Sequence, residues 1–254
     1  MDPKQRFSTR VENYIKYRPG YPSGVLETLR SGCGLVPGAL VADIGSGTGL
    51  LSQLFLDFGC QVTGVEPNDE MRAAAERLLA KYTRFNSLAG SAEETGLAPT
   101  SVDFITAGQA FHWFDPPRAR SEFLRILKQE GWVALVWNSR RTTSTPFLRA
   151  YENLLTTYAT DYAQVNHQNV EADEHLIPDF FGGSCQRAEF ENVQIFDYEG
   201  LLGRLMSSSY APEPGHPNYM PMLAELRHIF ERFQHNGGVA FEYDTNLYYG
   251  QLQR

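Results

Sequence analysis

The sequence predicts an α/β fold built on a doubly wound, mostly parallel sheet, and three observations support this prediction. Short apolar runs that suit buried strands recur between Leu40 and Trp137. Apolar-periodic segments that suit helices lie between those runs. The clearest strand–turn–helix unit is Leu40–Leu51, LVADIGSGTGLL, where an apolar run ends in an acid and a glycine turn before apolar periodicity resumes.

The glycine turn in this unit predicts a small-molecule site. Glycines let the backbone approach a ligand, and the free amides of a helix N-terminus point toward it. The spacing Gly45-x-Gly47-x-Gly49 departs from the dinucleotide-binding pattern, whose third glycine falls where Leu50 stands. The turn also lacks the Lys-Ser/Thr ending of a triphosphate-binding loop.

The charges around the turn favour a ligand with an ammonium group and no phosphate. From residue 40 to residue 71 there are five acids and no Lys or Arg. A phosphate beside Asp43 would meet a like charge, at about 1 kcal/mol per close pair in water and more in a cleft. S-adenosylmethionine fits better, because it offers an ammonium to Asp43 and a ribose diol to a second acid. Glu66, which ends the predicted strand Gln61–Glu66, is that acid.

The run from Val41 to Met71 resembles the motif region of the class I S-adenosylmethionine-dependent methyltransferases. Gly90–Leu97, GSAEETGL, and Gln109–Asp115, QAFHWFD, are similar to the small-molecule branch that includes trans-aconitate and ubiquinone–menaquinone enzymes, methyltransferase type 11. The resemblance implies a Rossmann-like, seven-stranded sheet whose last strand is antiparallel. It also implies S-adenosyl-L-methionine as cofactor and S-adenosyl-L-homocysteine as product. Its specific motifs span residues 40 to 137.

The resemblance assigns parts of the cofactor to parts of the chain. Asp43 would hold the ammonium, Gly45–Gly47 the carboxylate end, Glu66 the ribose and Ser91–Glu93 the adenine. Many family members have Asp in place of Ser91, so the Ser91 hydroxyl or Glu93 is expected to replace that contact. The expected cofactor-binding residues are Asp43, Gly45, Ser46, Gly47, Glu66, Pro67, Met71, Ser91, Ala92, Glu93 and Gln109.

The N-terminal segment, residues 1–22, has helical periodicity and spaced aromatic residues. The helix is expected to end at Arg18–Pro22. Its aromatic residues either pack on the outside of the domain or, as the resemblance implies, form a lid in which Tyr14 and Tyr17 face the acceptor pocket. A tyrosine ring attracts a sulfonium cation by about 0.5 to 2 kcal/mol.

Apolar periodicity and helix-start and turn residues predict the next helices and strands. The expected helices and strands up to residue 108 are a helix at Val25–Leu35, a helix at Met71–Ala80 after the start signal Pro67–Asp69, a weak strand at Phe85–Ala89 and a buried strand at Ser101–Gly108. Two residues have a second interpretation. Met71 is either an adenine contact or core filler, and Ser91 is either an adenine contact or a helix cap.

The loop after Ser101–Gly108 should face the same crevice as the glycine turn, because ligands bind beyond the carboxyl ends of parallel strands. The aromatic residues Trp113 and Phe114 would line the substrate pocket. His112 is either a catalytic base or a hydrogen-bonded structural residue. The loop has neither the Asn/Asp-Pro-Pro-Tyr motif nor the Pro-Cys nucleophile of DNA methyltransferases, so a DNA substrate is not expected.

The second half of the chain is expected to complete the sheet. A helix at Arg118–Lys128 and a strand at Trp132–Trp137 precede an insertion over the active-site mouth, residues 138–184, which contains a helix at Phe147–Tyr158. Later elements are a strand at Ala188–Tyr198, a helix at Leu201–Met206, a helix from Pro221 to Asn236 and a final strand at Val239–Leu247. The polar residues of the insertion lack metal-ligand spacing, so no metal is expected: Asp161, His167, Glu171, Asp173, Glu174 and His175.

Residues 1–254 therefore read as one domain, with a cofactor-binding core at 38–137 and C-terminal strands and helices at 185–254. A net charge of −8 speaks against nucleic acid or an anionic membrane as the main partner. Cys33, Cys60 and Cys185 form neither a disulfide framework nor a zinc pattern. With no signal-peptide core and no long apolar segment, a cytoplasmic protein is expected.

The sequence thus predicts methyl transfer from S-adenosylmethionine to an O, N or C atom of a small molecule. No nucleophile or metal cluster is needed, because the cofactor already carries an activated leaving group. Two alternatives stay open. One is an NAD(P)-dependent oxidoreductase, and the other is an S-adenosylmethionine-binding protein without transferase activity.

Overall fold

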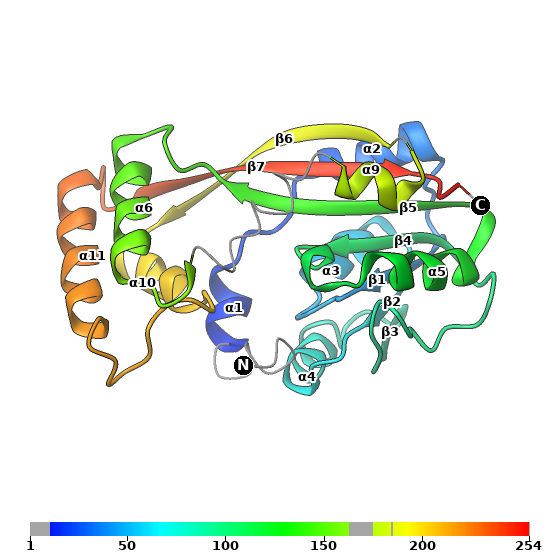
Figure 1. Ribbon diagram of the computed structural model, residues 1–254, viewed down its shortest axis with the longest axis horizontal. Coiled ribbons are helices and arrows are strands. Elements are labelled where there is room, and N and C mark those ends of the chain that lie inside the picture. Colours follow the sequence, from blue (N-terminus) through cyan, green and yellow to red (C-terminus); the bar gives the residue numbers. More distant parts are fainter. Residues whose placement is uncertain (1–10, 163–174, 184, 254) are drawn as a thin grey trace.

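A seven-stranded sheet with the order β3-β2-β1-β4-β5-β7-β6 forms the centre of the computed structural model, which describes residues 11–162, 175–183 and 185–253 (Figure 1). The first five strands pair with one another in parallel: β1 (Leu40–Ile44), β2 (Gln61–Val65), β3 (Phe85–Leu88), β4 (Val102–Gly108) and β5 (Leu127–Arg140). The last strand, β7 (Val239–Gly250), lies between β5 and β6 (Gln186–Phe196) and is antiparallel to both. This confirms the predicted Rossmann-like sheet.

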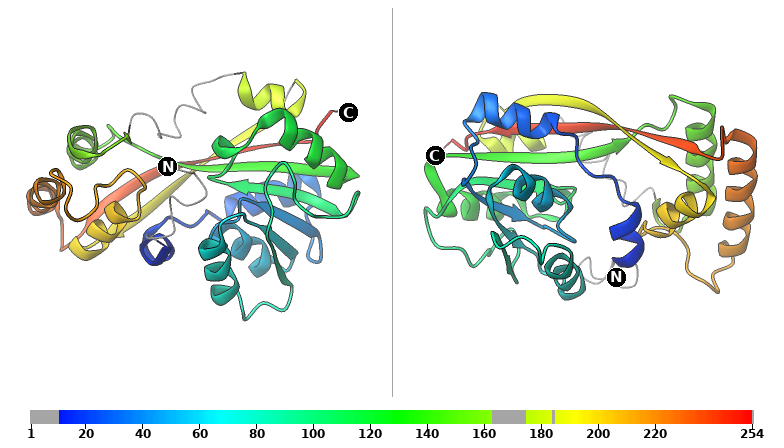
Figure 2. Two further views of the ribbon diagram at one scale, coloured as in Figure 1. Left: turned by 60° about the horizontal axis from the view of Figure 1, so that its bottom comes forward. Right: turned by 180° about the vertical axis from the view of Figure 1, so that it is seen from behind.

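Helices cover both faces of the parallel strands (Figure 2). On one face α2 (Gly24–Cys33) and α3 (Leu50–Phe58) bury a core that includes Leu29 and Phe55. On the other face α5 (Pro116–Ile126) and α9 (Leu176–Phe181) bury a core that includes Phe123 and Phe180. A further helix, α4 (Asp69–Leu78), follows β2.

A third core lies beyond the ends of the four shorter strands, where β5, β6 and β7 continue. Three helices pack there, α6 (Pro146–Tyr158), α10 (Tyr198–Met206) and α11 (Tyr219–Phe233) (Figure 1). We call these helices and the adjoining strand ends the distal lobe. The first helix, α1 (Val11–Tyr17), connects the two parts of the molecule. Ile15 packs on Met71 of α4, while the Tyr17 ring lies against Gly203 of α10.

Local sequence signals explain where several helices begin. The Asn68 side chain accepts a hydrogen bond from the Met71 N–H at 2.9 Å, and this caps α4 where the sequence predicts a helix start. Asp115 caps α5 and Asp197 caps α10 in the same way. Each cap satisfies an amide that has no partner inside its own helix.

Most predicted elements are present within a few residues of their expected ends, and three differ. The strand expected at Trp132–Trp137 spans Leu127–Arg140, because Val102 of β4 pairs with Leu127 at its start and β7 pairs with Asn138 and Arg140 at its end. No helix follows Ser91–Glu94, whose backbone forms an isolated bridge instead, so the helix-cap interpretation of Ser91 is wrong. The helix α9 was not expected, although its residues fall within the predicted insertion.

Part of the predicted insertion belongs to the distal lobe, where α6 packs in the third core. Residues 163–174 lie outside the described residues, and so do the expectations placed on His167, Glu171, Asp173 and Glu174. The division of the chain into a lid, a core, an insertion and a C-terminal part stays a prediction.

Candidate active site

The glycine turn between β1 and α3 has a left-handed backbone at three positions. The φ angles of Gly45, Gly47 and Gly49 are 67°, 56° and 84°, which side-chain-bearing residues rarely adopt. A Cβ on Gly45 would lie 2.6 Å from the Ala110 Cβ, and one on Gly49 would lie 2.6 Å from Leu79 Cδ1. A Cβ on Gly47 would have no atom within 4 Å, so the turn is tightly packed at both ends and open at its middle.

The carboxylate of Glu66 lies beside this turn. Its Oε2 accepts a hydrogen bond from the Gly47 N–H at 2.9 Å, and its Oε1 accepts one from the Asn68 N–H at 2.9 Å. Burial of the side chain raises the pKa of Glu66, while the two N–H donors oppose that rise. The end of β2 therefore presents an acid that is held in place by backbone amides.

Asp43 lies beneath the turn and is fully buried. Ser52 Oγ donates a hydrogen bond to it at 2.6 Å, and Thr106 Oγ1 donates another at 3.2 Å. Burial raises the pKa of Asp43 to about 6, although these hydroxyl groups favour the charged form. The side chain thus connects β1 to α3 and β4.

The loop after β3 joins the loop after β4. Glu93 Oε1 accepts a hydrogen bond from the Asp115 N–H at 2.9 Å. Partial burial would raise the pKa of Glu93, but this bond and one from the Ser91 hydroxyl lower it. Ala92 is buried in the core between these residues. The expected adenine-binding residues therefore lie next to the aromatic loop.

Two residues of the loop after β4 face the sheet or the glycine turn. Gln109 has a φ of 54°, and its side-chain Nε2 donates to the Asn138 carbonyl at 3.0 Å, which ties the loop to β5. Phe114 lies 3.6 Å from the position that a Cβ of Gly45 would take. Trp113 is 40% exposed, which leaves much of its ring available to a ligand.

His112 lies in the same loop, in the short 3₁₀ helix Phe111–Trp113. Its Nδ1 is buried and has no hydrogen-bond partner among the described residues. Burial lowers the pKa of His112 to about 4, because the charged imidazolium is poorly solvated there. The imidazole is therefore neutral near pH 7.

The expected lid and pocket residues do not all lie at this edge. The Tyr17 ring packs on Gly203 and on Phe196, at 6.5 Å between ring centroids, in the distal lobe. Met71 is buried against Ile15 and Ala74. Pro67 is partly buried, and Ser46 is close to Gly64. The side chain of Tyr14 lies outside the described part of the structure.

Sequence reasoning missed the residues that support Asp43 and the end of β4. Ser52 and Thr106 bind the Asp43 carboxylate, and a Cβ on Gly108 would lie 2.5 Å from the Tyr21 hydroxyl oxygen. Thr106 could have been found from the sequence, because it is a hydroxyl residue inside an otherwise apolar strand. In the described ranges no cluster of His, Cys, Asp and Glu is suited to a metal ion. Nor is any described helix long and apolar enough to cross a membrane.

Known proteins that resemble the chain are methyltransferases. A family model described as a methyltransferase domain matches residues 42–135. A methyltransferase-like protein of Schizosaccharomyces pombe is 30% identical over 244 residues, which are 94% of this chain and 92% of that protein. A Mycobacterium tuberculosis protein named as a methyltransferase is 38% identical over 136 residues, 53% of this chain; the match spans about half of the relative's length, 52%.

Solved structures share the fold at low sequence identity. A protein described as a type II methyltransferase from Anaeromyxobacter dehalogenans has a TM-score of 0.70 at 20% identity, covering 93% of this chain and 98% of that one. Phosphoethanolamine N-methyltransferase 2 of Haemonchus contortus, solved with S-adenosylhomocysteine, has a TM-score of 0.55 at 19% identity, covering 99% of this chain and 59% of that one. Both likenesses concern the arrangement of strands and helices.

Proposed function

The chain belongs to the class I S-adenosylmethionine-dependent methyltransferases, and from this premise we propose that it transfers a methyl group to an oxygen, nitrogen or carbon atom of a small molecule. The observation that carries the proposal is the glycine turn, open at Gly47 and flanked by two buried acids. No Lys or Arg occurs between residues 40 and 71, and the next cation, Arg72, donates to the Glu66 carbonyl and pairs with Asp69. The donor set therefore fits an ammonium and a ribose diol better than a pyrophosphate.

We assign the residues around the turn to parts of the cofactor. Glu66 has lone pairs left for the ribose hydroxyls after it accepts two amide hydrogen bonds. Asp43 attracts the ammonium from beneath, and Gly45–Gly47 let the backbone approach the carboxylate end. The remaining assigned residues would surround the adenine and the sulfur: Pro67, Met71, Ser91, Ala92, Glu93 and Gln109.

When bound, S-adenosylmethionine supplies a methyl group on a positively charged sulfur, so the leaving group is already activated. The protein's task is to align the acceptor atom with that carbon at about 3 to 3.5 Å and to exclude water. Trp113 and Phe114 offer apolar walls for this purpose. The proton that the acceptor atom loses needs a recipient. We assign that role to the neutral His112, whose Nδ1 is unpartnered among the described residues. Because burial disfavours the imidazolium, His112 would act as a weak base that passes the proton on to water and does not keep it.

A thermal-shift titration tests the cofactor assignment. S-adenosylhomocysteine at about 100 times its dissociation constant should stabilise the folded state by about 2.7 kcal/mol, which raises the melting temperature by several degrees. NADH under the same conditions should give no shift. A folded protein that responds to NADH and not to S-adenosylhomocysteine would be the oxidoreductase alternative.

The variant Glu66→Gln tests the ribose contact within the same experiment. It keeps the size of the side chain but loses the charge, so we expect S-adenosylhomocysteine to bind about tenfold more weakly or worse. Glu76→Gln, on the exposed side of α4, is the matched control and should bind normally. Equal binding by both variants contradicts the role of Glu66. Release of S-adenosylhomocysteine during turnover separates an enzyme from a binding protein.

A further inference from the structure

The carboxyl end of β4 is covered by a residue from the N-terminal part of the chain. A Cβ on Gly108, the last residue of β4, would lie 2.5 Å from the Tyr21 hydroxyl oxygen and 3.1 Å from Tyr21 Cζ. The same Cβ would lie 3.0 Å from Leu51 Cδ2, in the first turn of α3. The Tyr21 hydroxyl therefore occupies the space that a side chain at position 108 would fill, between the end of β4 and the start of α3.

This position is on the side of the sheet that holds the buried acid Asp43. Thr106 precedes Gly108 by two residues on β4, so both positions face the same side. Thr106 Oγ1 donates to the Asp43 carboxylate at 3.2 Å, and Ser52 of α3 binds the same group. Two residues of a strand span about 7 Å. The Tyr21 hydroxyl thus lies one strand repeat beyond Thr106, at the sheet edge where ligands bind in open α/β folds.

Tyr21 is held in this place through the carbonyl of the residue before it. The chain between α1 and α2, blue in Figure 1, passes beside the long strands. The Gly20 carbonyl accepts a hydrogen bond from Asn138 Nδ2 at 3.1 Å and another from Asn192 Nδ2 at 2.9 Å. One donor comes from β5 and the other from β6. The backbone next to Tyr21 is therefore fixed by two strands at once.

The amide group of Asn138 is itself fixed. Its side chain is 3% exposed, and its Oδ1 accepts hydrogen bonds from Asn192 Nδ2 at 3.1 Å and from Thr245 Oγ1 of β7 at 2.5 Å. Its backbone carbonyl accepts a hydrogen bond from Gln109 Nε2 at 3.0 Å. Buried hydrogen-bonded networks of this kind favour one arrangement of their members. The network thus connects the segment before α2 with the loop after β4.

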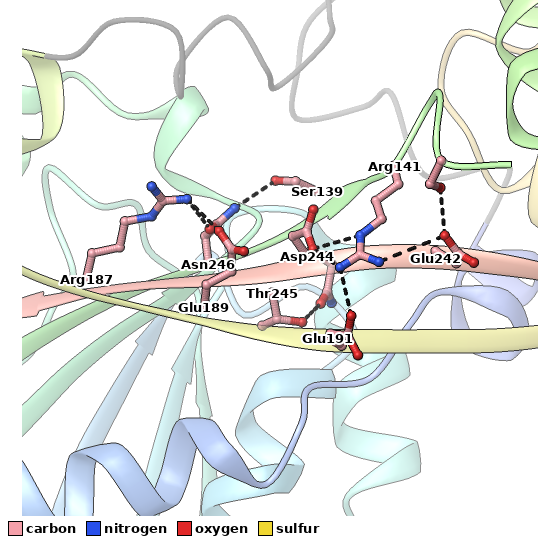
Figure 3. Close-up of polar contacts among 11 residues, drawn as sticks. Ser139, Arg141, Arg187, Glu189, Glu191, Glu242, Asp244, Thr245 and Asn246 are labelled. Atoms are coloured by element: carbon pink, nitrogen blue, oxygen red, sulfur yellow. Dashed lines mark hydrogen bonds and ion pairs between the residues drawn. The ribbon is translucent and has the colours of Figure 1, made fainter.

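The opposite face of the same strands is cross-linked at the same level. Arg141, the residue after β5, pairs with Asp244 of β7 at 2.6 Å and with Glu191 of β6 at 3.2 Å (Figure 3). These two acids directly precede Thr245 and Asn192, and successive side chains of a strand point to opposite faces. The strands that carry the amide network are therefore held together from both faces.

We propose that the Tyr21 hydroxyl donates a hydrogen bond to the carboxylate of the bound cofactor, and that Asn138 and Asn192 position it. The proposal rests on the proposed function, which assigns the cofactor's ammonium to Asp43. The carboxylate needs donors, and no Lys or Arg occurs from residue 40 to residue 71. The hydrogen of a phenol hydroxyl can rotate toward a ligand. A hydrogen bond to a charged acceptor is also stronger than one between neutral groups.

Two ligands separate a contact with the carboxylate from a general effect on the site. S-adenosylhomocysteine carries the carboxylate, whereas its decarboxylated analogue keeps the adenosine and the ammonium and lacks that group. In calorimetric titration, Tyr21→Phe should bind S-adenosylhomocysteine about tenfold more weakly than the wild type and should bind the analogue equally well. If Tyr21→Phe weakens both ligands equally, or neither, the proposal is wrong. A wild-type protein that binds neither ligand contradicts the proposed function instead.

Tyr82→Phe is the matched control for this variant. Tyr82 precedes β3, away from the carboxyl ends of the parallel strands, and its hydroxyl donates to Asp57. The substitution removes the same hydroxyl group from the protein, so Tyr82→Phe should bind both ligands as the wild type does. An equal loss of S-adenosylhomocysteine affinity in the two variants would show that the Tyr21 hydroxyl has no specific role.

Asn192→Ala tests the positioning role, because it removes one of the two donors to the Gly20 carbonyl. The affinity for S-adenosylhomocysteine should fall about threefold in the wild-type background. It should not fall further in the Tyr21→Phe background, since Asn192 acts through the Tyr21 hydroxyl. An equal fall in both backgrounds would mean that Asn192 acts on the fold as a whole.

Gly108→Ala tests the location of the hydroxyl without any ligand. The added Cβ competes with the Tyr21 hydroxyl oxygen for the same space, so the variant should melt at a lower temperature than the wild type. In the Tyr21→Phe background the nearest atom is gone, and the decrease should be smaller. An equal decrease in both backgrounds would show that the hydroxyl lies elsewhere and would overturn the proposal.

Discussion

The glycine-turn edge and the distal lobe both bury charge, but they hold it in different ways. At the turn, Asp43 and Glu66 accept hydrogen bonds from backbone amides and hydroxyl groups that the strand–turn–helix geometry brings to them. In the distal lobe, Arg140 and Arg204 donate to side-chain oxygens, those of Glu152, Tyr162, Tyr243 and Ser208. The shared family fold fixes the first arrangement, whereas side-chain choice in the lobe sets the second.

The largest expected effect tests whether the two regions are independent. Leu226 of α11 is fully buried in the distal core, and Leu226→Ala should lower the free energy of unfolding by about 2 to 5 kcal/mol. Because α11 packs on α6 and α10, the affinity of the folded protein for S-adenosylhomocysteine should stay within about twofold of the wild type. Urea unfolding and calorimetric titration measure the two quantities.

Leu29→Ala is the matched control for that variant, since Leu29 is equally buried in the core beneath β1. It should lose a similar amount of stability. If Leu226→Ala loses tenfold in S-adenosylhomocysteine affinity and Leu29→Ala does not, the distal core shapes the cofactor site. The two regions would then not be independent.

An intermediate effect concerns the charge beneath the turn. Burial raises the pKa of Asp43 from 3.8 to about 6, so the folded state holds this proton more tightly than the unfolded state. The resulting stability is fully present below pH 4 and is lost as the pH rises through 6. A shift of about two pKa units corresponds to about 3 kcal/mol.

Asp43→Asn removes this titration. Relative to the wild type, the variant should gain up to about 3 kcal/mol of stability between pH 4 and pH 7.5, while S-adenosylhomocysteine binds more weakly. Urea unfolding across that range measures the difference, with Asp179→Asn on the exposed side of α9 as control. If the difference in unfolding free energy between Asp43→Asn and the wild type does not vary with pH, ionisation of Asp43 costs the folded state no stability, and the prediction is wrong.

The smallest expected effect is at His112. Burial lowers the pKa of His112 to about 4, so its charge should not change between pH 5.5 and pH 8. The imidazole C–H resonance, assigned by its absence in His112→Gln, should keep a constant chemical shift across that range. The exposed His228 of α11 provides a comparison in the same spectra. A midpoint near 6.5 for His112 would contradict the buried, neutral imidazole.

The sequence predicts the turn edge well because its signals are local. The glycine spacing, Glu66 at the end of a strand and Asn68 as a helix cap all act within one strand–turn–helix unit or its neighbour. The extension of β5 to Arg140 could not be predicted, because it depends on pairing with β7 near the other end of the chain. The contact of Arg140 with Tyr151 and that of Arg204 with Tyr243 could not be predicted either, because they depend on how α6 and α10 pack against the strands.

The position of β7 in the sheet also determines when the strands can pair during synthesis on the ribosome. The strands β1 to β4 and their helices are made first and can pair as they appear. The free edge of β5, however, waits until Val239–Gly250 has been synthesised, because β7 alone joins β5 to β6. Until then a long apolar edge is open to other nascent chains. A truncation that removes β7 should therefore leave a core that aggregates, because the edge of β5 then stays unpaired.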